Sequence, residues 1–127
     1  MSTMRNEILS AFKNAQFGDT EGTFRAVYCF DPALSVFQGH FPDRPVLPGV
    51  FQIEMIRIAL EKICKKRYTI IEVNKAKFSS MILPSEEILI NARMPAGDEN
   101  TWIVAALEVE QKVKANISIT VKPKKDK

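Results

Sequence analysis

The spacing of hydrophobic positions changes along the chain from helical to alternating. Between Met4 and Ala15 the apolar residues recur at helical spacing, which predicts a short helix packed on the edge of the domain through Ile8, Leu9 and Phe12. From Glu21 to Pro32 the pattern alternates and predicts a strand that ends at Asp31-Pro32. One face of this strand would carry Phe24, Ala26, Tyr28 and Phe30, and the other Thr23, Arg25 and Val27.

A second and much more apolar helix is predicted after a proline-rich loop. Eight of the eleven residues from Val50 to Leu60 are apolar, so this helix would be exposed to solvent along only a narrow stripe. Pro48 fits its first turn, where a missing N–H costs nothing. A helix this apolar is normally central and wrapped by a sheet, and we expect it to fray within the sequence EKICKKR.

The rest of the chain is predicted to be strand. We expect one long or bulged strand over 68–83, a turn at Pro84-Ser85, a strand over 86–94 and a turn over 95–100. A hairpin around Gln111 follows, and both of its arms alternate with period two. Four such strands in a meander give an α+β fold, in which one antiparallel sheet wraps around one long central apolar helix.

Length and composition indicate one ordinary globular domain over residues 1–127. A domain of this size buries only about two thirds of its unfolded surface. A wide cavity within one subunit would be hard to support, so an oligomer is a natural remedy. No apolar run is long enough to span a bilayer and the N-terminus has no signal-peptide pattern, so we expect a cytoplasmic protein with no membrane partner.

Charge and cysteine content argue against a nucleic-acid-binding protein and against a disulfide-bonded one. A net charge of +3 with scattered basic residues is too weak to indicate nucleic-acid binding. Cys29 and Cys64 lie far apart and are interpreted as buried free thiols in a reducing compartment. No metal or cofactor site is predicted. The basic tail over 122–127 is interpreted as solubilising.

The start of the apolar helix is the strongest candidate for chemistry. Gly49 would expose a backbone N–H at the positive end of the helix, where a carbonyl oxygen could be polarised. Glu54 lies about 7.5 Å further along the axis, and its side chain leans back toward the same end. Apolar neighbours would disfavour its charged form, which suits a proton donor. His40, the single histidine, is braced by nearby prolines and could act as a base.

Each of these residues also has a purely structural interpretation. Glu54 could pair with Arg57 three residues later, and Glu61 would continue that polar stripe. His40 could be a loop residue bonded to a backbone carbonyl. Gly49 could be only a helix-start glycine. Taken singly, none of the three demands an active site.

Together, however, the segment FQGHFPDRPVLPGVFQIEM resembles the signature of the 3-hydroxyacyl-carrier-protein dehydratases of the hotdog fold. That signature is a GHFPxxPxxPG loop, here Gly39 to Gly49, followed by a helix that bears an acid fourteen positions after the histidine, here Glu54. The later segment NKAKFSSMILPSE is also similar to a family strand and its proline-containing turn. The likeness spans most of the chain.

The resemblance implies the reaction and its residues. His40 would take the α-proton of a 3-hydroxyacyl thioester, and Glu54 would protonate the departing 3-hydroxyl, directly or through water. The Gly49 amide would hold the thioester oxygen, with Phe41, Pro48 and Val50 beside the substrate. The family works as a homodimer with shared active sites, in which the acyl chain enters a tunnel between subunits, and dimers can assemble further. The acyl substrate would be attached as a thioester to the phosphopantetheine of acyl carrier protein, or to coenzyme A, and no other cofactor would be needed.

The sequence also departs from the family pattern. Asp43 stands where a glycine is common, Met55 and Ile58 replace a small residue and a glutamine, and the later turn reads Pro-Ser-Glu. These changes leave the chemical residues in place and fit either fatty-acid synthesis or a specialised polyene, pigment or polyketide pathway. A glutamate acid resembles the general dehydratase branch more than the isomerising branch.

The carrier protein is acidic, so basic residues are candidates for docking it, or else form a solvated face. They are Lys62, Lys65, Lys66, Arg67, Lys75 and Lys77. Two other functions stay open. A hotdog thioesterase would hydrolyse the thioester, although such enzymes lack the GHFP loop, and a non-catalytic subunit would only bind the acyl carrier.

Overall fold

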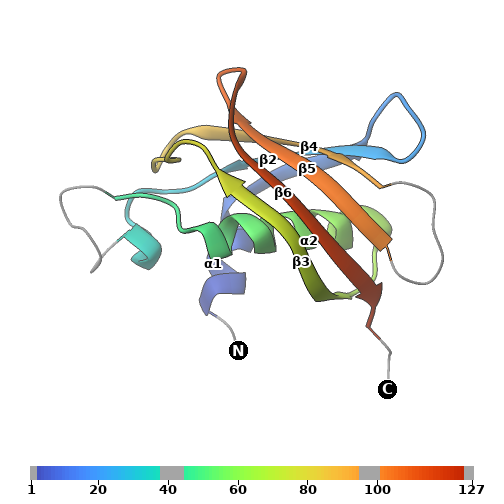
Figure 1. Cartoon of the computed structure of the whole chain (residues 1–127). Helices are drawn as coiled ribbons and strands as arrows, with labels where there is room; N and C mark the ends of the chain where they lie inside the picture. Colours follow the sequence, from blue (N-terminus) through green and yellow to red (C-terminus); the bar gives the residue numbers. More distant parts are fainter. Residues whose placement is uncertain (1–2, 38–44, 95–100, 125–127) are drawn as a thin grey trace.

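The computed structural model describes residues 3–37, 45–94 and 101–124, which form one curved sheet with helices on its concave side (Figure 1). The helical elements are α1 (Thr3–Ala11), η1 (Ser35–Phe37) and α2 (Gly49–Cys64). The strands are β1 (Phe12–Phe17), β2 (Thr23–Cys29), β3 (Tyr68–Phe78), β4 (Glu87–Arg93), β5 (Thr101–Val109) and β6 (Lys112–Pro123).

The sheet is antiparallel throughout, with the strand order β1-β2-β4-β5-β6-β3. The predicted meander is therefore wrong in one respect, because β3 pairs with β6 and not with its sequence neighbour β4. Sequential strands are neighbours in only about two thirds of cases. β3 lies at the edge of the sheet and leaves most of its side chains exposed. Its register shifts at two places, so of the two predicted forms, long or bulged, the bulged one is observed. The segment after Phe78 is not strand.

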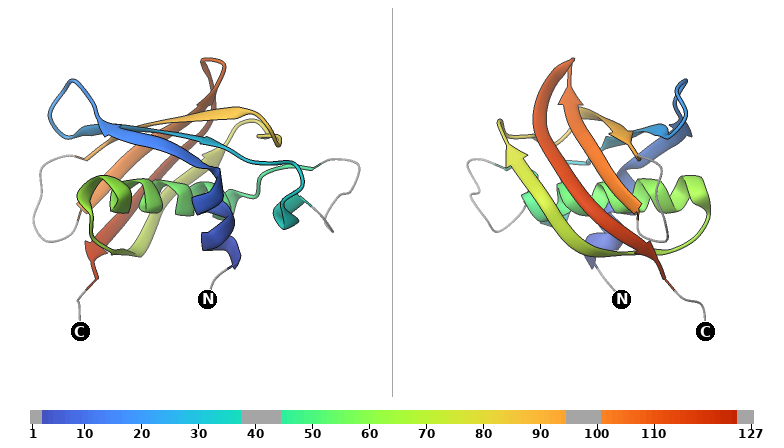
Figure 2. Two further views of the ribbon diagram at one scale, coloured as in Figure 1. Left: turned by 180° about the vertical axis from the view of Figure 1, so that it is seen from behind. Right: turned by 45° about the vertical axis from the view of Figure 1, so that its right-hand side comes forward.

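The N-terminal helix is shorter than predicted. It ends at Ala11, and the next residues form β1, which pairs with β2. The sequence of β1 has little alternation, so its pairing with β2 and not its own pattern determines its structure. α1 lies beside α2 on the same side of the sheet and buries Ile8 and Ala11 (Figure 2). The concave side thus holds both predicted helices, and the prediction of a sheet wrapped around one long helix alone is not confirmed.

The core lies between α2 and the inner face of the sheet, as the periodicity predicted for β2, β5 and β6. Its largest buried side chains include Tyr28, Phe24, Phe30, Met55, Ile56, Leu60, Ile90 and Ile103. Tyr28 is fully buried, and its hydroxyl donates to the Met55 carbonyl at 2.7 Å. Burial raises the pKa of Tyr28 far above its usual value. This bond ties the middle of α2 to the sheet.

The turns and the cysteines bear on smaller predictions. Ser85 has a positive φ of 72° in the predicted Pro-Ser turn, and Glu110 and Gln111 have positive φ in the predicted hairpin. The predicted turn over 95–100 lies outside the described residues.

The cysteines are free thiols, but both are half-buried, whereas the prediction had them buried. Lys122 and Pro123 belong to β6, so the tail begins later than predicted. No helix in the described ranges has the length and apolar character to cross a membrane.

Candidate functional site

His40 and Phe41 lie in the segment 38–44, outside the described residues, but both flanks of that segment are described. On the first flank, η1 ends at Phe37, whose buried ring packs against Phe30 with 6.4 Å between centroids. The Phe30 ring also meets Phe51 of α2 at 6.3 Å. One aromatic cluster therefore joins the end of η1, the end of β2 and the first turn of α2.

On the second flank, the chain enters α2 through a buried Leu47. Its N–H donates to the Ile82 carbonyl at 2.8 Å, and its own carbonyl accepts from Nε2 of Gln52 at 3.1 Å. Pro48 is the residue before α2 and not part of its first turn, a small correction to the prediction. Gln52 is buried, and its Oε1 has no hydrogen-bond partner within the described part of the chain.

Gly49 opens α2, where the first N–H groups have no acceptor within the helix. The Phe78 ring of β3 lies directly beside it, and a Cβ built on Gly49 would stand 2.7 Å from Cζ of that ring. Only glycine fits there without a shift of Phe78. Val50, predicted to contact the substrate, is 55% exposed.

Glu54 lies in the second turn of α2, on the same face as Arg57. Nε of Arg57 donates to Oε1 of Glu54 at 2.9 Å, and Nη2 contacts the same oxygen. This is the structural alternative recognised in the sequence. Apolar neighbours were expected to desolvate Glu54, but its nearest polar partner is a guanidinium and its side chain is 23% exposed. The physical reason is the three-residue spacing, which places both side chains on one helix face.

Glu61 continues this polar stripe and is more deeply buried, with a side chain 5% exposed. It accepts from Nη1 of Arg57 at 3.1 Å and from the Tyr68 N–H at 2.9 Å. Arg5 of α1 and Arg67 complete the cluster at 3.0 and 3.5 Å. The sequence signalled only the Arg57 contact; the others depend on how α1 and β3 pack.

The predicted docking residues fall into two groups. Lys65, Lys66 and Arg67 line a cavity of about 310 Å³ at the C-terminal end of α2, together with Arg5 and Lys62. Lys75 and Lys77 are exposed on the edge strand β3 and do not line this cavity. Lys66 lies over the Tyr68 ring at 5.9 Å, and burial raises the pKa of Tyr68 to about 12.

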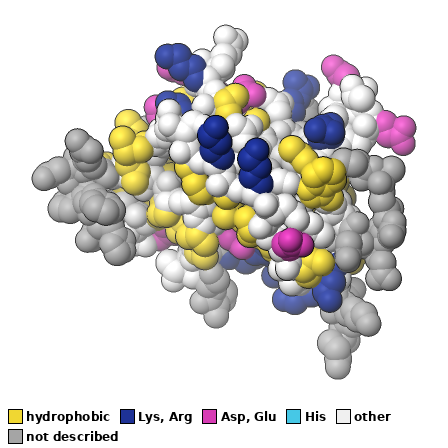
Figure 3. Space-filling view, in the orientation of Figure 1, with side chains coloured by type: hydrophobic (Ala, Val, Ile, Leu, Met, Phe, Trp, Pro, Cys, Tyr) yellow, Lys and Arg dark blue, Asp and Glu magenta, His cyan; other side chains and the backbone are white. Residues whose placement is uncertain are grey.

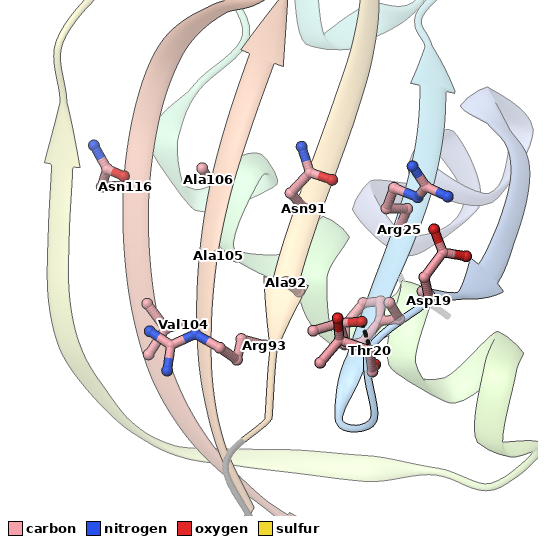
Figure 4. Close-up of a pocket in the computed structure, with 13 residues that line it drawn as sticks. Asp19, Thr20, Arg25, Asn91, Ala92, Arg93, Val104, Ala105, Ala106 and Asn116 are labelled. Carbon is pink, nitrogen blue, oxygen red and sulfur yellow. Dashed lines mark hydrogen bonds between the residues drawn. The ribbon is translucent and has the colours of Figure 1, made fainter.

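The hollow in Figure 4, of about 460 Å³, lies on the outer face of the sheet and holds none of the predicted site residues. Polar side chains such as Arg25, Asn91 and Asn116 come from one cross-strand row, and the small Ala106 leaves the space between them. Within the described ranges, no three His, Cys, Asp or Glu side chains are grouped as a metal site requires.

Comparison with known proteins identifies the family. The family model for the ApeI dehydratase, called ApeI-like, matches residues 16–119. The chain belongs to the ApeI-like dehydratase family. It is also 33% identical to a 3-hydroxyacyl-[acyl-carrier-protein] dehydratase FabZ of Polynucleobacter asymbioticus over 98 residues, 69% of this chain and 66% of that enzyme. For the FabZ of Clostridium acetobutylicum the identity is 29%, over 68% of each chain. The chain thus spans about two thirds of the length of these relatives.

Solved structures agree on the fold. The dehydratase heterocomplex ApeI:P from Xenorhabdus doucetiae superposes with a TM-score of 0.71 at 19% identity, covering 87% of this chain and 96% of that one. An uncharacterised protein from Erwinia carotovora gives 0.67 at 21% identity, covering 89% and 95%. The fold is accordingly hotdog-like, an antiparallel sheet curved around a helix, as the sequence resemblance implied.

In this ApeI-like chain the described residues bring Gly49 and Glu54 onto one helix and fix the ends of the segment that carries His40. Two contributors were missed by sequence reasoning. Gln52 holds the Leu47 carbonyl, and Phe78 closes against Gly49. A polar residue within an apolar helix was a visible signal for Gln52, whereas Phe78 reaches the site only through the packing of β3.

Proposed function

We propose that this chain dehydrates a 3-hydroxyacyl thioester, carried on the phosphopantetheine of an acyl carrier protein, to the trans-2-enoyl thioester. The observation that carries the proposal is the start of α2. There, Gly49 and Glu54 share one helix, directly after a segment that is bound to the core at Phe37 and at Leu47. The histidine of that segment, His40, is part of a loop sequence that matches the one preceding the acid in the dehydratase signature. Membership of the ApeI-like family supports this reaction.

The proposed chemistry needs only proton transfers. His40 removes the α-proton, the Gly49 N–H stabilises the charge that develops on the thioester oxygen, and Glu54 gives a proton to the departing hydroxyl. The products are the enoyl thioester and water, so no redox cofactor is required. Both contacts from Arg57 are to Oε1 of Glu54, and we assign the other oxygen, Oε2, to the hydroxyl group.

A second hotdog subunit completes the site in this proposal. β3 is an edge strand, and edge strands offer unpaired backbone groups to a partner. Hydrophobic side chains are exposed on β3, on the segment that follows it and at the start of α2 (Figure 3). These exposed residues are Val50, Ile71, Val73, Phe78, Met81 and Leu83. Large apolar side chains gathered on one part of a surface are a feature of interaction sites. We propose a homodimer in which His40 of one subunit works with Glu54 of the other, and in which dimers can assemble further.

The ApeI:P neighbour is a heterocomplex, so a related but different hotdog subunit is the alternative partner. Size-exclusion chromatography with light scattering separates these cases. A homodimer that Val73→Lys converts to monomers supports the proposal, because the added charge stands on the edge where the partner pairs. Thr120→Lys, on the paired strand β6, is the matched control and should leave the dimer intact. A wild-type chain that is monomeric alone, and dimeric only with another hotdog protein, would favour the heteromer.

The carrier protein is proposed to dock through basic residues, since its surface is acidic. The cavity at the end of α2 offers the densest group, with Lys65, Lys66 and Arg67 around it. The lysines of β3 are the alternative group. Charge reversal of each group, followed by the KM for a carrier-bound substrate against a coenzyme A substrate, would decide which group matters.

The reaction itself is tested by hydration of a crotonyl thioester. Wild type should turn over, and Glu54→Gln should lower kcat by about 10²- to 10⁴-fold because general acid catalysis is lost. Glu21→Gln, an exposed glutamate in a turn, is the control and should keep full activity. A wild type inactive on every carrier-bound and coenzyme A substrate would count against the proposal. Release of free thiol would indicate a thioesterase instead, and a co-purified acyl carrier without turnover a non-catalytic subunit.

A further inference from the structure

Glu7 of α1 is a buried acid that faces another element of the chain. It is 8% exposed, and both of its carboxylate oxygens meet η1. Oε1 accepts from the Val36 N–H at 3.1 Å, and Oε2 accepts from the Ser35 hydroxyl. These partners stand 28 and 29 residues away in the chain. A buried carboxylate is costly unless it is well hydrogen-bonded. Here both hydrogen bonds come from residues of η1.

That turn leads directly into the segment that carries the proposed base. His40 follows the last residue of η1, Phe37, by three positions. The packing of Phe37 on Phe30 is apolar, and apolar packing has little directional preference. The bonds from Glu7 are directional. They fix how η1 is oriented up to Phe37, the last described residue before the segment that carries His40.

We infer that Glu7 is a positioning residue for the proposed base, acting through Ser35 and Val36. This inference rests on the proposed function, and it assigns a role to a helix outside residues 16–119, the range that the family model matches. α1 and η1 lie on the same side of the sheet (Figure 2). The Glu7 side chain bridges them through its bonds to Ser35 and Val36. Glu7 takes no part in the proton transfers.

The test compares Glu7→Ala with Glu7→Gln and with Ile8→Val. Ile8 is fully buried on the same helix, so Ile8→Val loosens the packing of α1 and leaves the contacts to η1 intact. Activity is measured well below the melting temperature of every variant. Glu7→Ala should lower kcat by about 10- to 100-fold with KM little changed, as misplacement of a catalytic group does. Glu7→Gln should recover most of the rate, since its amide can still accept from Val36.

Hydrogen exchange at the Val36 and Phe37 amides provides a second measurement. Protection should fall in Glu7→Ala and hold in Ile8→Val. Equal losses of kcat in Glu7→Ala and Ile8→Val, or full kcat in Glu7→Ala, would overturn the inference. A wild type without turnover would overturn the proposed function itself, and the exchange result would then decide whether Glu7 anchors η1 at all.

Discussion

The ion cluster around Glu61 gives the sharpest test of how α2 is held. In Glu61→Leu the Tyr68 N–H loses its acceptor, and Arg57 and Arg5 each lose a carboxylate. Breaking a buried ion pair costs about 3–5 kcal/mol, and leaving an amide unsatisfied costs about 1–3 kcal/mol. Arg57 and Arg5 are 18% and 26% exposed, so water compensates them in part. We therefore expect a loss of about 3 kcal/mol.

This loss converts to a melting temperature through the unfolding entropy. At ~2.1 cal/mol/K per residue, a chain of 127 residues unfolds with an entropy of about 0.27 kcal/mol/K. A loss of about 3 kcal/mol then lowers the melting temperature by ~11 °C. Thermal unfolding followed by circular dichroism measures it, at one fixed protein concentration because association would add stability.

A double-mutant cycle with Arg57→Leu separates the pair from the rest of the cluster. Both single changes remove the same contact, so the double variant should lose less than the two losses added together, by about 1–2 kcal/mol. The matched control is Glu108→Leu, whose carboxylate accepts from the Asn91 amide on the outer face. This control should change stability by less than about 1 kcal/mol. Strict additivity in the cycle, or a melting temperature for Glu61→Leu no lower than that of the control, would refute the reasoning.

Two further predictions concern Tyr28 and Gly49. Tyr28→Phe should cost about 1 kcal/mol at neutral pH through the lost bond to Met55. Because burial raises the pKa of Tyr28, the folded chain keeps a proton that the unfolded chain releases above pH 10.0, so wild-type stability is lost as pH rises beyond that value. The variant's melting temperature should fall less steeply above pH 10.0, and parallel curves would contradict this. Gly49→Ala should alter the free energy of unfolding by less than about 1 kcal/mol, because Phe78 is 45% exposed and can move away from the added methyl group. The same change should lower kcat for crotonyl hydration. Unchanged kcat would remove Gly49 from the proposed site.

Local periodicity was sufficient where one face of an element is buried. The alternation in β2, β5 and β6 and the dense apolar spacing of α2 predicted these elements, since burial imposes a period of two on strands and 3.6 on helices. The Pro-Ser turn and the hairpin at Gln111 were also predictable, because turn chemistry is local. For the candidate site, the sequence motif alone predicted that Gly49 and Glu54 share one helix.

Long-range pairing decided the rest. The sequence by itself determined which segments alternate and which residues could do chemistry. Only the tertiary structure decided that β3 crosses to the far edge beside β6, that Phe12–Phe17 is a strand, and that Glu7 reaches η1. The physical reason is that β3 and β1 bury too little of either face to impose a pattern on their own residues, and a buried carboxylate is satisfied by whichever donors the packing of distant elements brings to it.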